Sequence, residues 1–221
     1  MDANLPVETL RDRKKRRTRE SIAAAAAALF ATHGYDPVTV ADVARAADVS
    51  EQTVYNHFPT KEHLVFDRAD EMIAGLLARV RDRSADESVL DAVRHRALQV
   101  ADVLAAMPEG PASGGMPYLT ATSPALARSL NDLYVGNAEM LAAVLGEEGD
   151  RVADSVELRV EALALLAPSH AFITELGRRV ARGESTAEAA GALRPGLEAA
   201  FDVLDLGLGA PARGQRRRSR R

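Results

Sequence analysis

Six of the seven residues from 51 to 57 carry a side chain that can donate or accept a hydrogen bond. They are Glu51, Gln52, Thr53, Tyr55, Asn56 and His57. Side-chain amides can bond the edge of adenine through two hydrogen bonds, and hydroxyl or imidazole groups suit phosphate oxygens. Val54 and Phe58 are four residues apart and would share the apolar side of a helix. The segment therefore predicts a short helix whose polar side contacts DNA.

A second short helix is expected directly before this one, because apolar residues at positions 40, 43, 44 and 47 recur on one helical face. Thr39, followed by Asp42, is typical of a capping box. Asp48 falls at the turn, where Asp tolerates the left-handed conformation, and Ser50 can cap the next helix through its hydroxyl. Two helices around a tight turn form the unit that presents one helix to the major groove.

The net charge of -4 at pH 7 conceals an uneven distribution. Residues 1–66 carry nine basic and nine acidic side chains, residues 67–209 carry 13 and 23, and residues 210–221 carry six arginines and no acid. Seven of the basic side chains lie between Arg11 and Arg19, with Asp12 as the one acid among them. Positive charge is thus concentrated beside the two-helix unit, where phosphates would lie.

The rest of the chain is also expected to be helical. Apolar periodicity, N-cap residues and Gly or Pro stops predict helices at about 12–33, 61–83, 84–107, 123–145, 150–182 and 185–206. Ser84 with Glu87 and Ser185 with Glu188 are interpreted as capping boxes. Residues 108–117 are too rich in Gly and Pro for a helix, which makes them a candidate gate loop. No strand pattern is visible, so the predicted fold class is all-α.

Several motifs within residues 12–66 resemble the tetracycline-repressor (TetR) family of transcriptional regulators. They are Arg16 to Arg19, Ala28 to Phe30, Gly34–Tyr35, Thr39 to Ala44, Val49–Ser50, Thr53 to Phe58 and Lys61 to Leu64. The resemblance implies an N-terminal three-helix helix-turn-helix domain at 1–60 and a larger helical ligand-binding and dimerisation domain at 61–209. The basic segment 210–221 is expected to be a disordered tail.

The resemblance also implies which residues contact the double-stranded DNA of an inverted-repeat operator. We expect the phosphates at Tyr55, His57 and Lys61, and the bases or nearby backbone at Glu51, Gln52, Thr53 and Asn56. Glu51 could equally serve only to complement the positive end of its helix. Thr39 and Ser50 complete this set, together with Arg16, Arg17 and Arg19 of the basic run.

A small-molecule effector is expected in the larger domain, where the aliphatic composition and the absence of Trp favour an apolar ligand. Its candidate lining residues are Leu76, His95, Met107, Tyr118, Tyr134, His170 and Phe172. Each of these side chains could equally belong to the packed core.

Other classes of protein are disfavoured by the sequence. Cysteine is absent, which excludes disulfides and thiol catalysis. Asp91 and His95 have the spacing of metal ligands, but also that of an ordinary exposed pair, so no metal or cofactor is expected. No nucleophile elbow, phosphate loop or zinc-helix motif is present to support an enzyme. Without a signal peptide or a long apolar run, the protein is expected to be cytoplasmic, with no membrane partner.

The sequence thus predicts a homodimeric, ligand-responsive transcriptional repressor that releases a palindromic operator when its effector binds. Two alternatives stay open. One is an effector-independent structural DNA-binding protein with little sequence preference. The other is an enzyme or protein-interaction module that reuses the two-helix unit.

Overall fold

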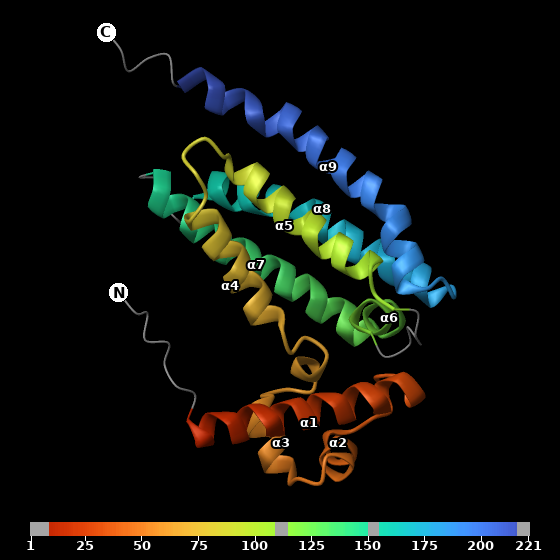
Figure 1. Ribbon diagram of the computed structural model, residues 1–221. Coiled ribbons are helices and arrows are strands. Elements are labelled where there is room, and N and C mark those ends of the chain that lie inside the picture. Colours follow the sequence, from red (N-terminus) through yellow and green to blue (C-terminus); the bar gives the residue numbers. More distant parts are fainter. Residues whose placement is uncertain (1–8, 109–114, 150–154, 216–221) are drawn as a thin grey trace. The chain divides into compact units, whose positions relative to one another are not determined.

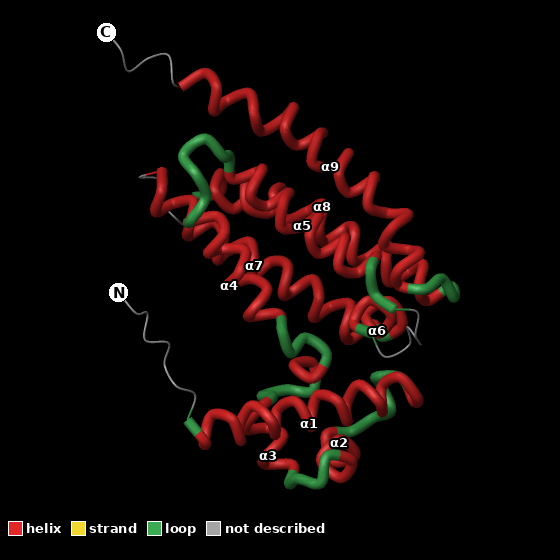
Figure 2. Tube along the Cα trace, viewed as in Figure 1, coloured by secondary structure: helices red, strands yellow, loops and turns green. Residues whose placement is uncertain are grey.

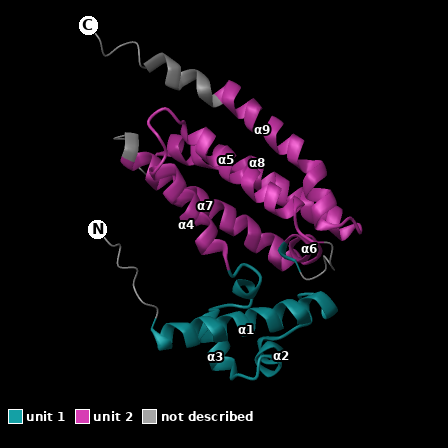
Figure 3. Ribbon diagram, viewed as in Figure 1, with its two compact units in different colours: residues 1–67, 113–116 teal, residues 68–112, 117–221 magenta. Residues whose placement is uncertain are grey.

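A computed structural model describes residues 9–108, 115–149 and 155–215, which form helices joined by loops and contain no strand (Figures 1 and 2). The all-α prediction is confirmed. The chain divides into two compact units, residues 1–67 with 113–116, and residues 68–112 with 117–221 (Figure 3).

The first unit contains α1 (Leu10–His33), α2 (Val40–Ala46), α3 (Glu51–His57) and the 3-10 turn η1 (Glu62–Leu64). α2 packs against both α1 and α3. Its core includes Ile22, Ala26, Phe30, Val43, Ala44, Val54 and Phe58. Of the apolar face predicted for α2, Val43 and Ala44 are buried, whereas Val40 and Ala47 are only half-buried. The core of this small unit therefore fixes α3 through one apolar side and leaves its other side open.

The expected turn between α2 and α3 is present. The backbone N–H of Asp42 donates to the Thr39 hydroxyl at 3.1 Å, and the Asp42 carboxylate accepts from the Thr39 backbone at 2.9 Å, which completes the capping box. Asp48 adopts φ 54°, and the Ser50 hydroxyl accepts from the backbone N–H of Thr53 at 3.1 Å. Local side-chain chemistry thus sets both ends of the turn.

The predicted helix over 61–83 is wrong in its first turns. The chain forms η1, leaves helical hydrogen bonding, and then begins α4 at Ala69, which ends at Arg81. The guanidinium of Arg19 donates to the Asp67 carbonyl oxygen at 2.9 Å, so this carbonyl has a partner from α1. The distant arginine favours an interruption that local helix propensity does not reveal.

The second unit continues from α4 through α5 (Val89–Ala105), α6 (Met116–Thr122), α7 (Pro124–Gly149), α8 (Val156–Ala181) and α9 (Thr186–Gln215). α5 packs along α9, α7 along α8, and α8 along α9, while α4 contacts α5 and α7. The shared core is aliphatic with a few aromatic side chains, and its fully buried members include Val80, Leu141, Leu158, Leu176 and Phe201.

Helix boundaries in this unit correct one prediction and extend another. The capping box of α5 is formed by Ser88 and Asp91, not by Ser84 and Glu87, because the Glu87 carboxylate is paired with Arg79. The box of Ser185 and Glu188 is confirmed. The helical backbone of α9 runs past the expected end near residue 206 to Gln215, while 216–221 of the expected tail and 109–114 of the expected loop lie outside the described residues.

Candidate nucleic-acid interface

The exposed side of α3 is polar and is held in place by two buried anchors. Val54 and Phe58 are each 1% exposed. Glu51, Gln52, Tyr55 and Asn56 are exposed, and they share one side of the helix at about 100° of rotation per residue. Thr53 and His57 are half-buried at the borders of this polar side.

Some of the polar groups on this side already have partners within the helix. The Gln52 amide donates to the Asn56 side-chain oxygen at 3.1 Å, which leaves the Gln52 oxygen and the Asn56 amide group available. The hydroxyls of Ser50 and Thr53 lie 2.8 Å apart, and the Thr39 hydroxyl donates to Asp42 at 2.6 Å. The main effect of these hydrogen bonds is to stabilise the helix ends at Thr39, Ser50 and Thr53.

Arg19, a residue of α1, holds the C-terminal end of α3 in place. Its guanidinium donates to the carbonyl oxygens of His57, at 2.6 Å, and of Asp67, at 2.9 Å, and lies 4.3 Å from the centroid of the Phe58 ring. The fork of arginine suits two acceptors at once. In this structure Arg19 therefore positions α3, with its charge next to the carbonyl end of that helix.

Lys61 is bound to the turn that follows α1. Its ammonium donates to the carbonyl oxygens of Tyr35, at 2.7 Å, and Asp36, at 3.3 Å, and lies 3.9 Å from the centroid of the Tyr35 ring. Burial lowers the pKa of Lys61, an effect opposed by Asp36 and Glu62. An ammonium has three donors, so these two carbonyls use two of the three N–H groups of Lys61.

The same turn is tied to η1 by a carboxylate. The Tyr35 hydroxyl donates to Glu62 at 3.0 Å. Burial, and to a smaller extent this hydrogen bond, raises the pKa of Tyr35. Hydrogen bonds, first from Thr60 and also from Tyr35, lower the pKa of Glu62. Glu62 thus remains ionised and anchors the turn.

The basic run of α1 has two different sides. Arg11, Lys14, Lys15 and Thr18 line a cleft of about 550 Å³ together with Asn56 and His57 of α3. Arg16 pairs with Glu20 at 3.0 Å, and by helical rotation both Arg16 and Arg17 lie on the side away from this cleft. The sequence predicts Arg16, Arg17 and Arg19 of this run as DNA contacts, whereas the residues of the run that line the cleft are Arg11, Lys14, Lys15 and Thr18.

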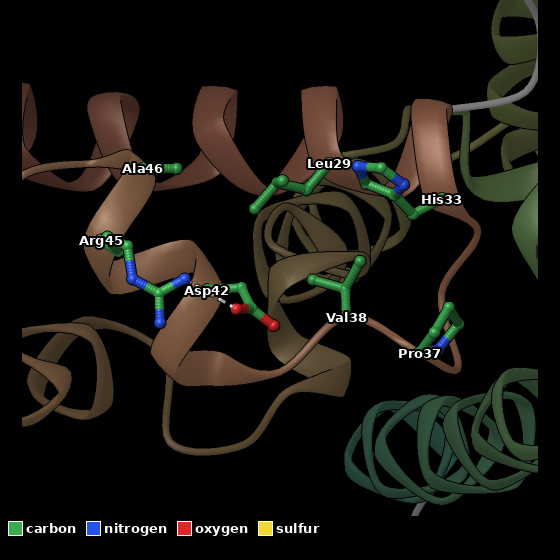
Figure 4. A pocket seen from close by; sticks show the side chains of 7 residues that line it. All are labelled: Leu29, His33, Pro37, Val38, Asp42, Arg45 and Ala46. Atoms are coloured by element: carbon green, nitrogen blue, oxygen red, sulfur yellow. Dashed lines mark hydrogen bonds and ion pairs between the residues drawn. The ribbon is translucent and has the colours of Figure 1, made fainter.

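A second hollow of about 560 Å³ in this unit is lined by the end of α1, the following loop and α2 (Figure 4). Leu29 and His33 contribute from α1 and Val38 from the loop, and Asp42 faces Arg45, its ion-pair partner at 3.0 Å. The Asp42 carboxylate already forms the hydrogen bond of the capping box. The hollow does not include any of the expected DNA-contacting side chains of α3.

The candidate effector residues in the second unit are only partly brought together. The rings of Tyr134 on α7 and His170 on α8 stack with centroids 4.5 Å apart, and the Tyr134 hydroxyl donates to the Leu163 carbonyl at 2.6 Å. Burial raises the pKa of Tyr134 and lowers that of His170. His95 and Met107 are exposed.

The other three candidates belong to the packed interior of this unit. Leu76 and Phe172 are buried in the core, and Tyr118 packs against it while remaining half-buried. Among the described residues, no cluster of three or more His, Asp or Glu side chains could hold a metal ion, and no helix is long and apolar enough to cross a membrane.

Comparison with known proteins supplies the family of the first unit. Residues 22–67 match the model of bacterial regulatory proteins of the tetR family. The HTH-type transcriptional regulator TcmR of Streptomyces glaucescens is 36% identical over 84 residues, which cover 38% of this chain and 37% of TcmR. The likeness to this relative therefore spans little more than a third of either protein.

Solved structures resemble a larger part of the fold at low sequence identity. The repressor NalD of Pseudomonas aeruginosa is 20% identical with a TM-score of 0.54, over 83% of this chain and 96% of NalD. A TetR-family regulator of Streptomyces coelicolor is 21% identical with a TM-score of 0.53, over 85% and 96%. FadR of Bacillus subtilis, solved with stearoyl-CoA, is 15% identical with a TM-score of 0.50, over 82% and 98%. The helix-turn-helix described above lies within the residues that match the tetR family model, and the solved structures share the fold of most of the chain.

Proposed function

We propose that the protein is a homodimeric transcriptional repressor that binds an inverted-repeat operator and releases it when a small apolar effector binds. One observation carries the proposal. The polar side of α3 is exposed above two buried anchors, Val54 and Phe58, within the residues that match the family model. Such a helix can enter a major groove as a rigid element.

The side chains of α3 divide into two roles. Gln52 and Asn56 lie next to each other on the exposed side, and their amides can bond base edges. Tyr55 is 44% exposed, which leaves its hydroxyl free to reach a phosphate. Lys61 adds its remaining N–H to the phosphate contacts. Glu51 lies at the positive end of α3 and can accept from cytosine or only stabilise that end.

Homodimerisation is supported by apolar side chains of α8 and α9 that are exposed to solvent. Val156 and Val160, one helical turn apart on α8, are 77% and 59% exposed, and Val203 and Leu206 on α9 are 68% and 82% exposed. Exposed apolar side chains that gather on one surface mark interaction sites, and we assign the dimer contact to these two helices. A two-fold dimer presents two copies of α3 and so requires inverted half-sites.

The effector is assigned to a regulatory domain at residues 61–209, with the DNA-binding domain at 1–60. The core of the regulatory domain is largely aliphatic, and the Tyr134–His170 pair adds one polar feature beside it. FadR, which shares this architecture, was solved with an acyl-CoA, so the fold can accommodate an apolar chain. An effector releases DNA only if it binds the low-affinity conformation more tightly.

A retention experiment separates this proposal from its alternatives. The full chain is incubated with a pool of DNA fragments from around its own gene and with excess competitor DNA. Retention of one palindromic fragment supports the repressor. Indiscriminate retention supports a structural DNA-binding protein, and no retention supports an enzyme or a protein-interaction module.

A further inference from the structure

The cleft between α1 and α3 is basic and has no acid in its lining. It is formed by Arg11, Lys14, Lys15 and Thr18, which lie on one side of the first turns of α1, and by Asn56 and His57 at the end of α3. Ile22 continues the same side of α1 and is fully buried, so the cleft is directly above the core of the unit.

The cations of the cleft are not neutralised by the described part of the protein. Arg11, Lys14 and Lys15 form no ion pair among the described residues, whereas Arg16, on the other side of α1, is paired with Glu20. Three like charges at one cleft repel one another, and an anion between them would remove this repulsion. Burial lowers the pKa of His57, and the nearby charges of Lys15 and Arg19 lower it further, as expected for an imidazole beside cations.

The position of the cleft identifies the anion. Asn56 belongs both to the cleft lining and to the exposed polar side of α3. A helix in the major groove is flanked by the phosphates of both strands, so a cleft at its end lies at backbone distance. Arg19 covers the His57 carbonyl, and thus reduces the negative charge at this end of the helix.

We propose that the cleft lined by Arg11, Lys14, Lys15, Thr18, Asn56 and His57 is the seat of one DNA backbone phosphate in each half-site. The inference rests on the proposed function, which it deepens by assigning the orienting contact to the cleft side of the basic run. Lysine and arginine supply the charge, and His57 can donate a hydrogen bond from the end of α3. A phosphate bound between two helices would fix the depth and angle at which α3 enters the groove.

The sequence Lys14-Lys15-Arg16-Arg17 supplies a matched control. K14Q/K15Q removes two charges from the cleft, and R16Q/R17Q removes two charges from the neighbouring positions that face away. Both full-length variants are titrated with the operator and with a random duplex at several salt concentrations. Both lose the general electrostatic attraction, so their difference measures the cleft.

We expect K14Q/K15Q to bind about tenfold more weakly than R16Q/R17Q, by the same factor on both duplexes, because a phosphate contact carries no sequence information. Its logarithmic salt slope should also be smaller by about 0.9 for each phosphate that the variant no longer neutralises. Equal affinities and slopes for the two variants would overturn the inference. A wild-type protein without preference for the operator would instead overturn the proposed function, while the comparison on the random duplex would still decide the cleft.

A neutral methylphosphonate, placed at each backbone position of the operator in turn, locates the phosphate. One position per half-site should weaken the wild type and have little further effect on K14Q/K15Q, since both changes remove the same interaction. Additive losses at every position would show that the cleft does not hold a phosphate.

Discussion

Replacing Arg19 with glutamine should loosen α3 without unfolding the second unit. The change removes two charge-assisted hydrogen bonds, of 2.6 Å to the His57 carbonyl and 2.9 Å to the Asp67 carbonyl, and the contact with the Phe58 ring. Each such bond contributes roughly 1.5–3 kcal/mol, but Arg19 is half-exposed and water can reach the freed carbonyls. We therefore expect α3 to lose about 2–4 kcal/mol of local stability.

Amide hydrogen exchange on the full chain measures this loss directly. A loss of about 2–4 kcal/mol corresponds to exchange from α3 that is roughly 30 to 700 times faster, up to the limit set by global opening. Exchange from α7 and α8 should be unchanged. Arg19→Lys keeps the charge but not the fork, and should recover only part of the protection. Unchanged exchange from α3, or equal acceleration in both units, would refute the positioning role of Arg19.

Three further changes test other contacts of the structure. A Cβ at Gly177 would lie 2.3 Å from the Pro117 carbonyl oxygen, so Gly177→Ala should cost about 1–3 kcal/mol of stability and lower the unfolding temperature. Gly136→Ala is the control, because a Cβ at Gly136 would meet open space and should not lower the unfolding temperature. Equal unfolding temperatures of the two variants would contradict the close approach of α6 to α8. Ser50→Ala removes the N-cap of α3, which should cost about 1 kcal/mol of stability and weaken binding to all DNA sequences. Ser50→Thr should restore most of the DNA affinity. A DNA titration that is unaffected by Ser50→Ala would exclude a role for the cap in binding. Burial and two neighbouring cations lower the pKa of His57, whereas a bound phosphate would favour its protonated form. DNA affinity should therefore rise as the pH falls from about 8 to about 6, and it should rise less in the His57→Asn variant. The same pH response in both proteins would argue against a contact between His57 and a phosphate.

The parts of the fold that the sequence predicts well are those decided by neighbouring residues. Thr39 and Asp42, Asp48 and Ser50 act within three or four positions of themselves, and all adopt the expected conformations. The break before α4 is not predicted, and it coincides with a hydrogen bond from Arg19, which is 48 positions away from the carbonyl that it binds. Long-range partners of this kind are not visible in local periodicity.

The candidate site shows the same division. The polar side of α3 follows from the spacing of its two apolar anchors, and the structure places it as expected. The cleft is not predicted when the whole basic run is treated as one charged segment. A helical projection gives the missing signal, since positions 11, 14, 15 and 18 share the side of the buried Ile22. The effector residues follow from residue type alone, which does not reveal which helices face one another.

Selection of bound sequences from random double-stranded DNA by the full-length protein is the decisive test of the proposed operator binding. We expect an enriched inverted repeat with half-sites about one helical turn apart or slightly more, because two copies of α3 related by a dimer axis must enter major grooves on one face of the DNA. Gln52→Ala should relax the preference at particular base pairs, at a cost of roughly 1–3 kcal/mol there. Enrichment of a direct repeat, of a single half-site bound with full affinity, or of no sequence at all would rule out a dimer that binds an inverted-repeat operator.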